Sequence, residues 1–124
     1  MALKDDLKTC LANTISLYLR AHGYHWNVEG EDFRSYHGLF EEIYSDLYDS
    51  VDPIAENIRK LQDYAPYRLE RLVELKNLDE GSVGTDPKSM SKDLLDALEA
   101  YIVDLNACFK AATDENQQGI ANFL

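Results

Sequence analysis

Apolar residues recur every three or four positions along most of this 124-residue chain. Such spacing places side chains along one side of an α-helix and is typical of amphipathic helices. The longest stripe predicts a helix over residues 33–64 and consists of Phe33, Tyr36, Phe40, Ile43, Leu47, Val51, Ile54, Ile58 and Leu61. No part of the pattern requires a β-strand. The sequence therefore predicts an all-α fold.

Three further segments show the helical period. They are a first helix over residues 4–28, a short helix over residues 67–75 and a third long helix over residues 87–113. In the short helix we expect Leu69, Leu72 and Val73 to face inward. The intervening residues 76–88 are rich in glycine and polar residues and are predicted to form a loop.

Glycine and proline indicate where the helices begin, bend and end. Gly30 ends the first helix, and Asp32 is the expected N-cap of the second. Pro53 lies inside the second helix, where it removes a backbone donor and predicts a bend over residues 49–53. Pro66 is expected to end this helix.

This order of helices predicts a four-helix bundle with a short crossover helix between the second and third long helices. We expect Asp114 and Glu115 to open the fourth helix of the bundle. A new apolar stripe begins at Ile120, and the sequence stops at Leu124. We therefore expect one domain over residues 1–124, truncated at the C-terminus, with its fourth helix only begun.

The composition excludes several classes of function. A formal net charge of −11 disfavours binding to DNA, RNA or anionic lipid and favours a surface that attracts cations. No run of about 18 apolar residues predicts a transmembrane helix, and Asp5 and Asp6 are unlike a signal peptide. We expect a cytoplasmic protein in which Cys10 and Cys108, each in an apolar helical stripe without C-x-x-C spacing, are buried free thiols.

The residues that indicate a chemistry lie between positions 25 and 56. They are two histidines and three carboxylates, a set of nitrogen and oxygen ligands suited to iron or a similar divalent metal: His25, His37, Glu41, Asp52 and Glu56. The last four share one face of the second helix, but His37 and Asp52 lie about 22 Å apart at 1.5 Å per residue. One metal ion cannot bind both ends. The set therefore divides into two half-sites, which two antiparallel copies of the chain could bring together about a two-fold axis.

The stretch H-W-N-V-E-G-E-D-F, followed by H-G-L-F-E and V-D-P-I-A-E-N-I-R, resembles the Dps family of mini-ferritins over about residues 18–60. The resemblance implies a ferritin-like bundle with a di-iron ferroxidase centre between two-fold-related subunits. His25, His37 and Glu41 would bind iron from one subunit, and Asp52 and Glu56 from the other. It further implies a hollow dodecamer that oxidises Fe(II) with hydrogen peroxide or O2 and stores Fe(III) oxide, which protects against oxidative damage.

Two further assignments follow from the resemblance, each beside a simpler alternative. Trp26 would lie near the di-iron site and donate an electron, or it is only an interface anchor. Asp114 and Glu115 would line pores that admit Fe(II), or they are acidic residues that stabilise a helix N-terminus.

Other functions stay open at this stage. One is a nucleoid protein that coats DNA, although the chain has no Lys/Arg-rich tail and its charge argues against it. Another is a structural helical shell with a vestigial metal site, in which Pro53 has displaced Asp52 from Glu56. A di-iron site within one subunit is disfavoured, because it requires E-x-x-H motifs that the sequence lacks.

Overall fold

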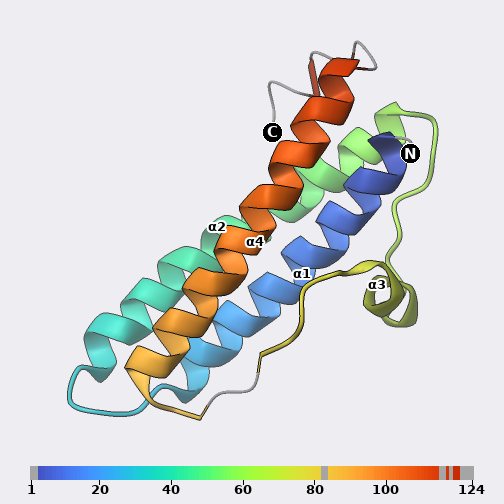
Figure 1. The fold of residues 1–124 in the computed structure, drawn as a ribbon. Coiled ribbons are helices and arrows are strands. Elements are labelled where there is room, and N and C mark those ends of the chain that lie inside the picture. Colours follow the sequence, from blue (N-terminus) through green and yellow to red (C-terminus); the bar gives the residue numbers. More distant parts are fainter. Residues whose placement is uncertain (1–2, 82–83, 115–116, 118, 121–124) are drawn as a thin grey trace.

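The computed structural model describes residues 3–81, 84–114, 117 and 119–120. Over these residues the chain forms four helices and no strand: α1 (Leu3–Asn27), α2 (Phe33–Lys60), α3 (Leu69–Leu75) and α4 (Pro87–Asp114). The long helices α1, α2 and α4 run side by side, and α3 lies beside α1 in the connection from α2 to α4 (Figure 1). The all-α prediction, with its short crossover helix, is confirmed. No helix in the described part of the chain is long and apolar enough to cross a membrane.

Two clusters of buried side chains hold the long helices together. The first lies toward the α1–α2 turn and includes Leu17, Tyr24, Phe40, Leu47, Met90, Leu94 and Tyr101. The second lies toward the start of α1 and the end of α4 and includes Leu3, Leu7, Leu11, Ile54, Ile58, Cys108 and Ala112. Phe40, Leu47, Ile54 and Ile58 belong to the stripe predicted for the second helix. Each large apolar side chain contributes about 1.5–3 kcal/mol by leaving water.

The ends of α2 differ in part from the predictions. Gly30 has φ +126°, a conformation that favours glycine, and it lets the chain reverse after α1. Asp32 is the N-cap residue, as predicted, although its side chain makes no capping hydrogen bond. The helix ends at Lys60 rather than near residue 64, because Gln62 takes a φ of 65° before Pro66 is reached.

Helix α2 continues through Pro53 to Lys60 as one element. Two side chains on either side of the proline bond back to carbonyls one turn earlier. Ser50 Oγ donates to the Asp46 carbonyl at 2.9 Å, and Asn57 Nδ2 donates to the Pro53 carbonyl at 2.9 Å. Asp52 and Glu56 therefore lie on the same helix as His37 and Glu41, and a bend over residues 49–53 stays a prediction.

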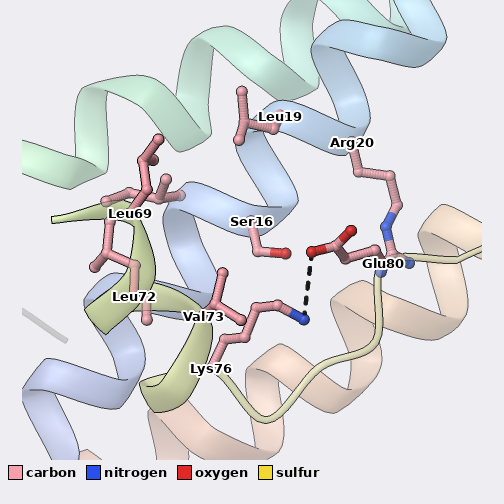
Figure 2. Close-up of a pocket in the computed structure, with 10 residues that line it drawn as sticks. Ser16, Leu19, Arg20, Leu69, Leu72, Val73, Lys76 and Glu80 are labelled. Atoms are coloured by element: carbon pink, nitrogen blue, oxygen red, sulfur yellow. Dashed lines mark ion pairs between the residues drawn. The ribbon is translucent and has the colours of Figure 1, made fainter.

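The short helix α3 is less buried than predicted. Leu72 is buried, but Leu69 and Val73 are 74% and 60% exposed, so the prediction that all three face inward is wrong. Their side chains instead line a groove of about 270 Å³ between α1 and α3, together with Leu19 and other α1 residues (Figure 2). A seven-residue helix that packs mainly on α1 cannot cover both sides of its apolar stripe.

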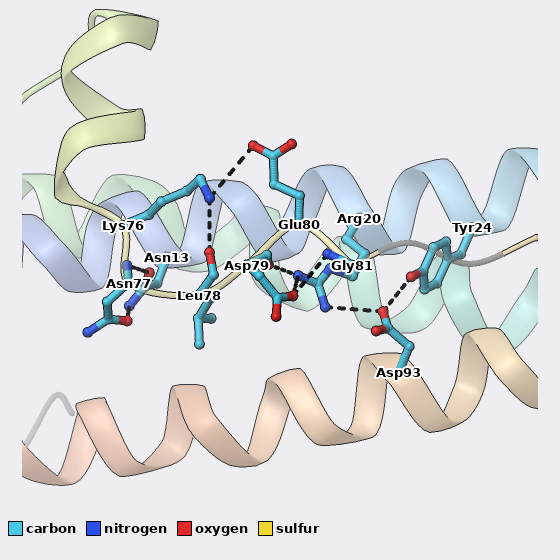
Figure 3. Close-up of polar contacts among 10 residues, drawn as sticks. All are labelled: Asn13, Arg20, Tyr24, Lys76, Asn77, Leu78, Asp79, Glu80, Gly81 and Asp93. Atoms are coloured by element: carbon cyan, nitrogen blue, oxygen red, sulfur yellow. Dashed lines mark hydrogen bonds and ion pairs between the residues drawn. The ribbon is translucent and has the colours of Figure 1, made fainter.

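Polar side chains on α1 hold the α3–α4 connection against the bundle (Figure 3). Arg20 is buried and donates from Nη1 to Asp93 Oδ2 at 3.1 Å and from Nη2 to the main-chain carbonyl of Asp79. The Tyr24 hydroxyl also donates to Asp93. This arrangement fixes the loop and the start of α4 beside the end of α1, where the candidate site lies.

Candidate metal centre

His25 and His37 meet where α1 ends and α2 begins. Their rings are stacked, with centroids 3.5 Å apart and planes inclined by 20°. His25 is buried and His37 half-buried. The five residues between Asn27 and Phe33 reverse the chain, so that the last turn of α1 lies against the first turns of α2.

Each histidine is held by the backbone of the other. The Nδ1 atom of His25 lies 2.7 Å from the carbonyl oxygen of His37, and the Nδ1 atom of His37 lies 2.7 Å from the carbonyl oxygen of His25. A carbonyl oxygen can only accept, so both Nδ1 atoms carry the hydrogen. In the neutral rings Nε2 then has a free lone pair, the form in which histidine binds a metal.

Neighbouring aromatic rings fix the orientation of the pair. Phe33 stacks on His37 with centroids 4.8 Å apart, and Tyr44 meets His25 edge-on at 5.2 Å. Locked rings of this kind hold their lone pairs in set directions, which lowers the entropic cost of binding a ligand.

The three candidate carboxylates lie elsewhere on α2. Glu41 is one turn beyond His37 and exposed, and it lines a shallow surface depression with Glu42 and Asp46. Asp52 and Glu56 are exposed further along the helix. Within the described residues, no three His, Cys, Asp or Glu side chains of one chain come together to hold a metal ion. One chain thus presents a histidine pair where α1 meets α2 and a separate carboxylate pair, Asp52 and Glu56, further along α2.

An aromatic cluster beside the histidines is a feature that sequence reasoning missed. His22 shares a 2.9 Å hydrogen bond with the Tyr18 hydroxyl, and its ring stacks on Tyr44 at 3.9 Å and lies 4.2 Å from Trp26. His22 is half-buried. The regular four-residue spacing of Tyr18, His22 and Trp26 on α1 was the available signal.

Comparison with known proteins places this geometry in a family. A model of the ferritin-like domain, from the ferritin family, matches residues 4–124. The crystal structure of a Dps protein from Vibrio cholerae, described there as a member of the ferritin-like diiron-carboxylate superfamily, superposes with a TM-score of 0.92 at 28% identity over 97% of this chain and 76% of that one. This chain belongs to the Dps family. Dps from Thermosynechococcus elongatus has the same TM-score at 26% identity, over 97% of this chain and 76% of that chain.

Sequence relatives agree with a place among the Dps proteins. An uncharacterised low-temperature-induced protein of Nostoc is 37% identical over 92% of this chain, and the DNA protection during starvation protein of Helicobacter pylori is 33% identical over 74% of it. The chain spans 65% of the length of each of these two relatives.

The sequence predicted that Asp114 opens a new helix, and this prediction is wrong. Asp114 is the last residue of α4 and does not open a new helix; its carboxylate pairs with Lys110 at 3.0 Å. An acidic side chain at a helix C-terminus is not stabilised by the helix dipole. The alternative that Asp114 stabilises the N-terminus of a helix is therefore also wrong. Glu115 lies outside the described residues.

Proposed function

We propose that this Dps-family chain oxidises Fe(II) at sites formed between two copies of itself and stores the product as Fe(III) oxide in a hollow shell. The observation that carries the proposal is the reciprocal hydrogen bonding of His25 and His37, which leaves both Nε2 lone pairs available. A histidine that only fills a core does not need this tautomer, whereas a metal-binding histidine does.

The roles of the ligands follow from their chemistry. The imidazole nitrogens of His25 and His37 bind Fe(II), and the carboxylates of Glu41 and of the partner copy supply negative charge that stabilises Fe(III). The carboxylates are Asp52 and Glu56 of the partner subunit, because the chain's own Asp52 lies about 22 Å along α2 from His37. The net charge of −11 draws iron to the protein surface.

Hydrogen peroxide is the proposed oxidant, with O2 as a second one. Two Fe(II) ions each give up one electron, the O–O bond of one peroxide breaks, and two waters form as the two oxygens take up two protons from solvent. No one-electron product such as hydroxyl radical is released, and this explains a protective role. Trp26, 60% exposed and close to His22, is proposed to supply an electron when only one iron is bound.

The shell is proposed to be a dodecamer built from two-fold dimers, with Asp114 and Glu115 near the pores. Relatives are named for protection of DNA, but the charge of these 124 residues argues against direct contact with DNA phosphates. Protection would then come from removal of iron and peroxide.

A complementation experiment tests the site between copies. The His37→Ala and Asp52→Ala variants are each loaded anaerobically with Fe(II), and ferric absorbance is followed after peroxide is added. Each variant alone should lose the fast phase, because both of its sites are damaged. When the two are unfolded together and refolded, half of the dimers are mixed, and each mixed dimer has one intact site of two.

Recovery of about a quarter of the wild-type amplitude is therefore expected for the mixture. A mixture as inactive as its components, with assembly verified by size-exclusion chromatography, would show that the ligands do not act across copies. Wild-type kinetics in both single variants would refute the site itself.

A further inference from the structure

Two cysteines that are distant in sequence lie side by side in the second core cluster. Cys10 is on α1 and Cys108 on α4, 98 positions apart, with their Sγ atoms 2.8 Å from each other. Each is 1% exposed and each is a free thiol, as the sequence predicted. The proposed iron chemistry uses neither of them.

The two thiols share one hydrogen bond, in which either sulfur can be the donor. Cys10 Sγ also lies 4.0 Å from the main-chain oxygen of Asp104, a second acceptor for its hydrogen. This sulfur–sulfur hydrogen bond and burial raise the pKa of the Cys108 thiol well above its usual range. Cys108 therefore tends to keep its proton, and the first attack on a peroxide is assigned to Cys10, whose Sγ lies 2.8 Å away.

We propose that Cys10 and Cys108 are an oxidation site at which a small hydroperoxide forms a disulfide between α1 and α4. The Cys10 thiolate attacks one peroxide oxygen: an S–O bond forms, the O–O bond breaks, and one water leaves once hydroxide takes up the thiol proton. Cys108 then attacks the sulfenic sulfur, the S–O bond breaks, and a second water leaves. Each sulfur loses one electron, and the peroxide gains two.

Geometry favours a disulfide over further oxidation. A disulfide is about 2.05 Å long, so the two sulfurs are already close to bonding distance. A sulfenic acid on Cys10 meets Cys108 before it meets a second peroxide, because both residues are buried among Leu7, Leu11 and Ile58. The same burial admits hydrogen peroxide, which is nearly as small as water, only during brief opening of the helix pair, and it excludes large thiol reductants such as glutathione.

The consequence of the bond is a covalent connection between α1 and α4 at one end of the described bundle. Closing a loop of this length restricts the unfolded chain, and the thermal midpoint should rise by on the order of 10 °C. The protein would thus be most stable when peroxide is abundant, the condition in which the proposed function is needed.

The test uses iron-free full-length protein with a chelator, so that its result does not depend on the iron site. The folded protein is treated with hydrogen peroxide, quenched with catalase, unfolded in iodoacetamide and weighed by mass spectrometry. We expect a chain lighter by two hydrogens with no alkylation, whereas untreated protein carries two alkyl groups. Reduction with dithiothreitol under denaturing conditions should restore both thiols, which can then be alkylated.

Matched controls separate the pair from single thiols. The Cys108→Ala variant should show a sulfenic acid on Cys10 that dimedone traps, and neither Cys108→Ala nor Cys10→Ala should gain thermal stability on peroxide treatment. Two alkylated cysteines in treated wild-type protein, added oxygen atoms without a disulfide, or disulfides between chains on a non-reducing gel would each overturn the proposal. The wild-type measurement decides it even if a variant does not fold.

Discussion

His25 and His37 each use Nδ1 to hold the main-chain carbonyl of the other at 2.7 Å, across the turn that joins α1 to α2. The pair therefore fixes the hairpin and the tautomer of both rings through the same two hydrogen bonds. A substitution at one histidine removes the bond from its own ring and the stacking between the rings, but the other ring keeps its bond to the unchanged main-chain carbonyl.

Replacing His37 by alanine should weaken metal binding strongly. Loss of one ligand and of the ring that stacks on His25 at 3.5 Å is expected to lower Co(II) affinity by roughly 100-fold. Isothermal titration calorimetry with Co(II) measures this without oxidation chemistry. The matched control is His22→Phe, which keeps a ring between Tyr44 and Trp26. An equal loss in the control would mean that ring packing, rather than ligation, governs the affinity.

Asp93 should contribute much more to stability than Asp79, although both contact Arg20. Asp93→Ala leaves the buried Arg20 guanidinium without its main counter-charge and Tyr24 without its acceptor. The free energy of unfolding should fall by about 3 kcal/mol. The Asp79 side chain is 92% exposed, and its main-chain carbonyl remains in Asp79→Ala, so that change should cost less than about 1 kcal/mol. Urea denaturation of the two variants, followed by circular dichroism, gives both values; similar losses would contradict this assignment.

Gly81 is expected to be intolerant of a side chain. It has φ +72°, and an alanine Cβ there would lie 2.8 Å from Asp93 Oδ2. Gly81→Ala should destabilise the fold by about 2 kcal/mol, since backbone strain adds to a displaced Asp93. Gly84 has no neighbouring atom within 4 Å of such a Cβ, and Gly84→Ala should change thermal stability little. A Gly81→Ala midpoint equal to that of Gly84→Ala would contradict the expected clash.

The protein should become less stable in alkaline solution, because two tyrosines are buried in the folded state and resist ionisation there. Burial, followed by the hydrogen bond to Asp93, raises the pKa of Tyr24, and burial raises the pKa of Tyr101. In the unfolded chain these phenols ionise near pH 10. Their contribution to the free energy of unfolding is therefore complete below pH 10 and is lost as the pH rises toward the folded-state pKa. The loss is roughly 1.4 kcal/mol per pH unit for each phenol.

Urea midpoints measured between pH 9 and pH 11.5 test the tyrosine prediction. The Tyr24→Phe and Tyr101→Phe variants should each show a shallower decline above pH 10 than the wild type. Tyr67→Phe is the control, because Tyr67 is 82% exposed. A decline of equal slope in all four proteins would assign the alkaline loss to other groups.

Much of the fold was predictable because helical periodicity is a local property. The stripes of α1, α2 and α4 gave their extents to within a few residues, and the buried members Phe40, Leu94 and Cys108 were among those expected. Leu69 and Val73 were misplaced because a short apolar run does not reveal how many neighbours surround it. Asp114 was misplaced because a polar run marks the region of a helix end but not which helix it belongs to.

The sequence by itself determined the helices, the Dps resemblance and the separation of His37 from Asp52, since rise per residue is the same in every α-helix. Only the tertiary structure decided that His25 and His37 share two hydrogen bonds, that Arg20 holds the α3–α4 connection, and that Cys10 meets Cys108. These contacts depend on the relative rotation and approach of separate helices, which are fixed by packing of whole side-chain surfaces rather than by any local pattern.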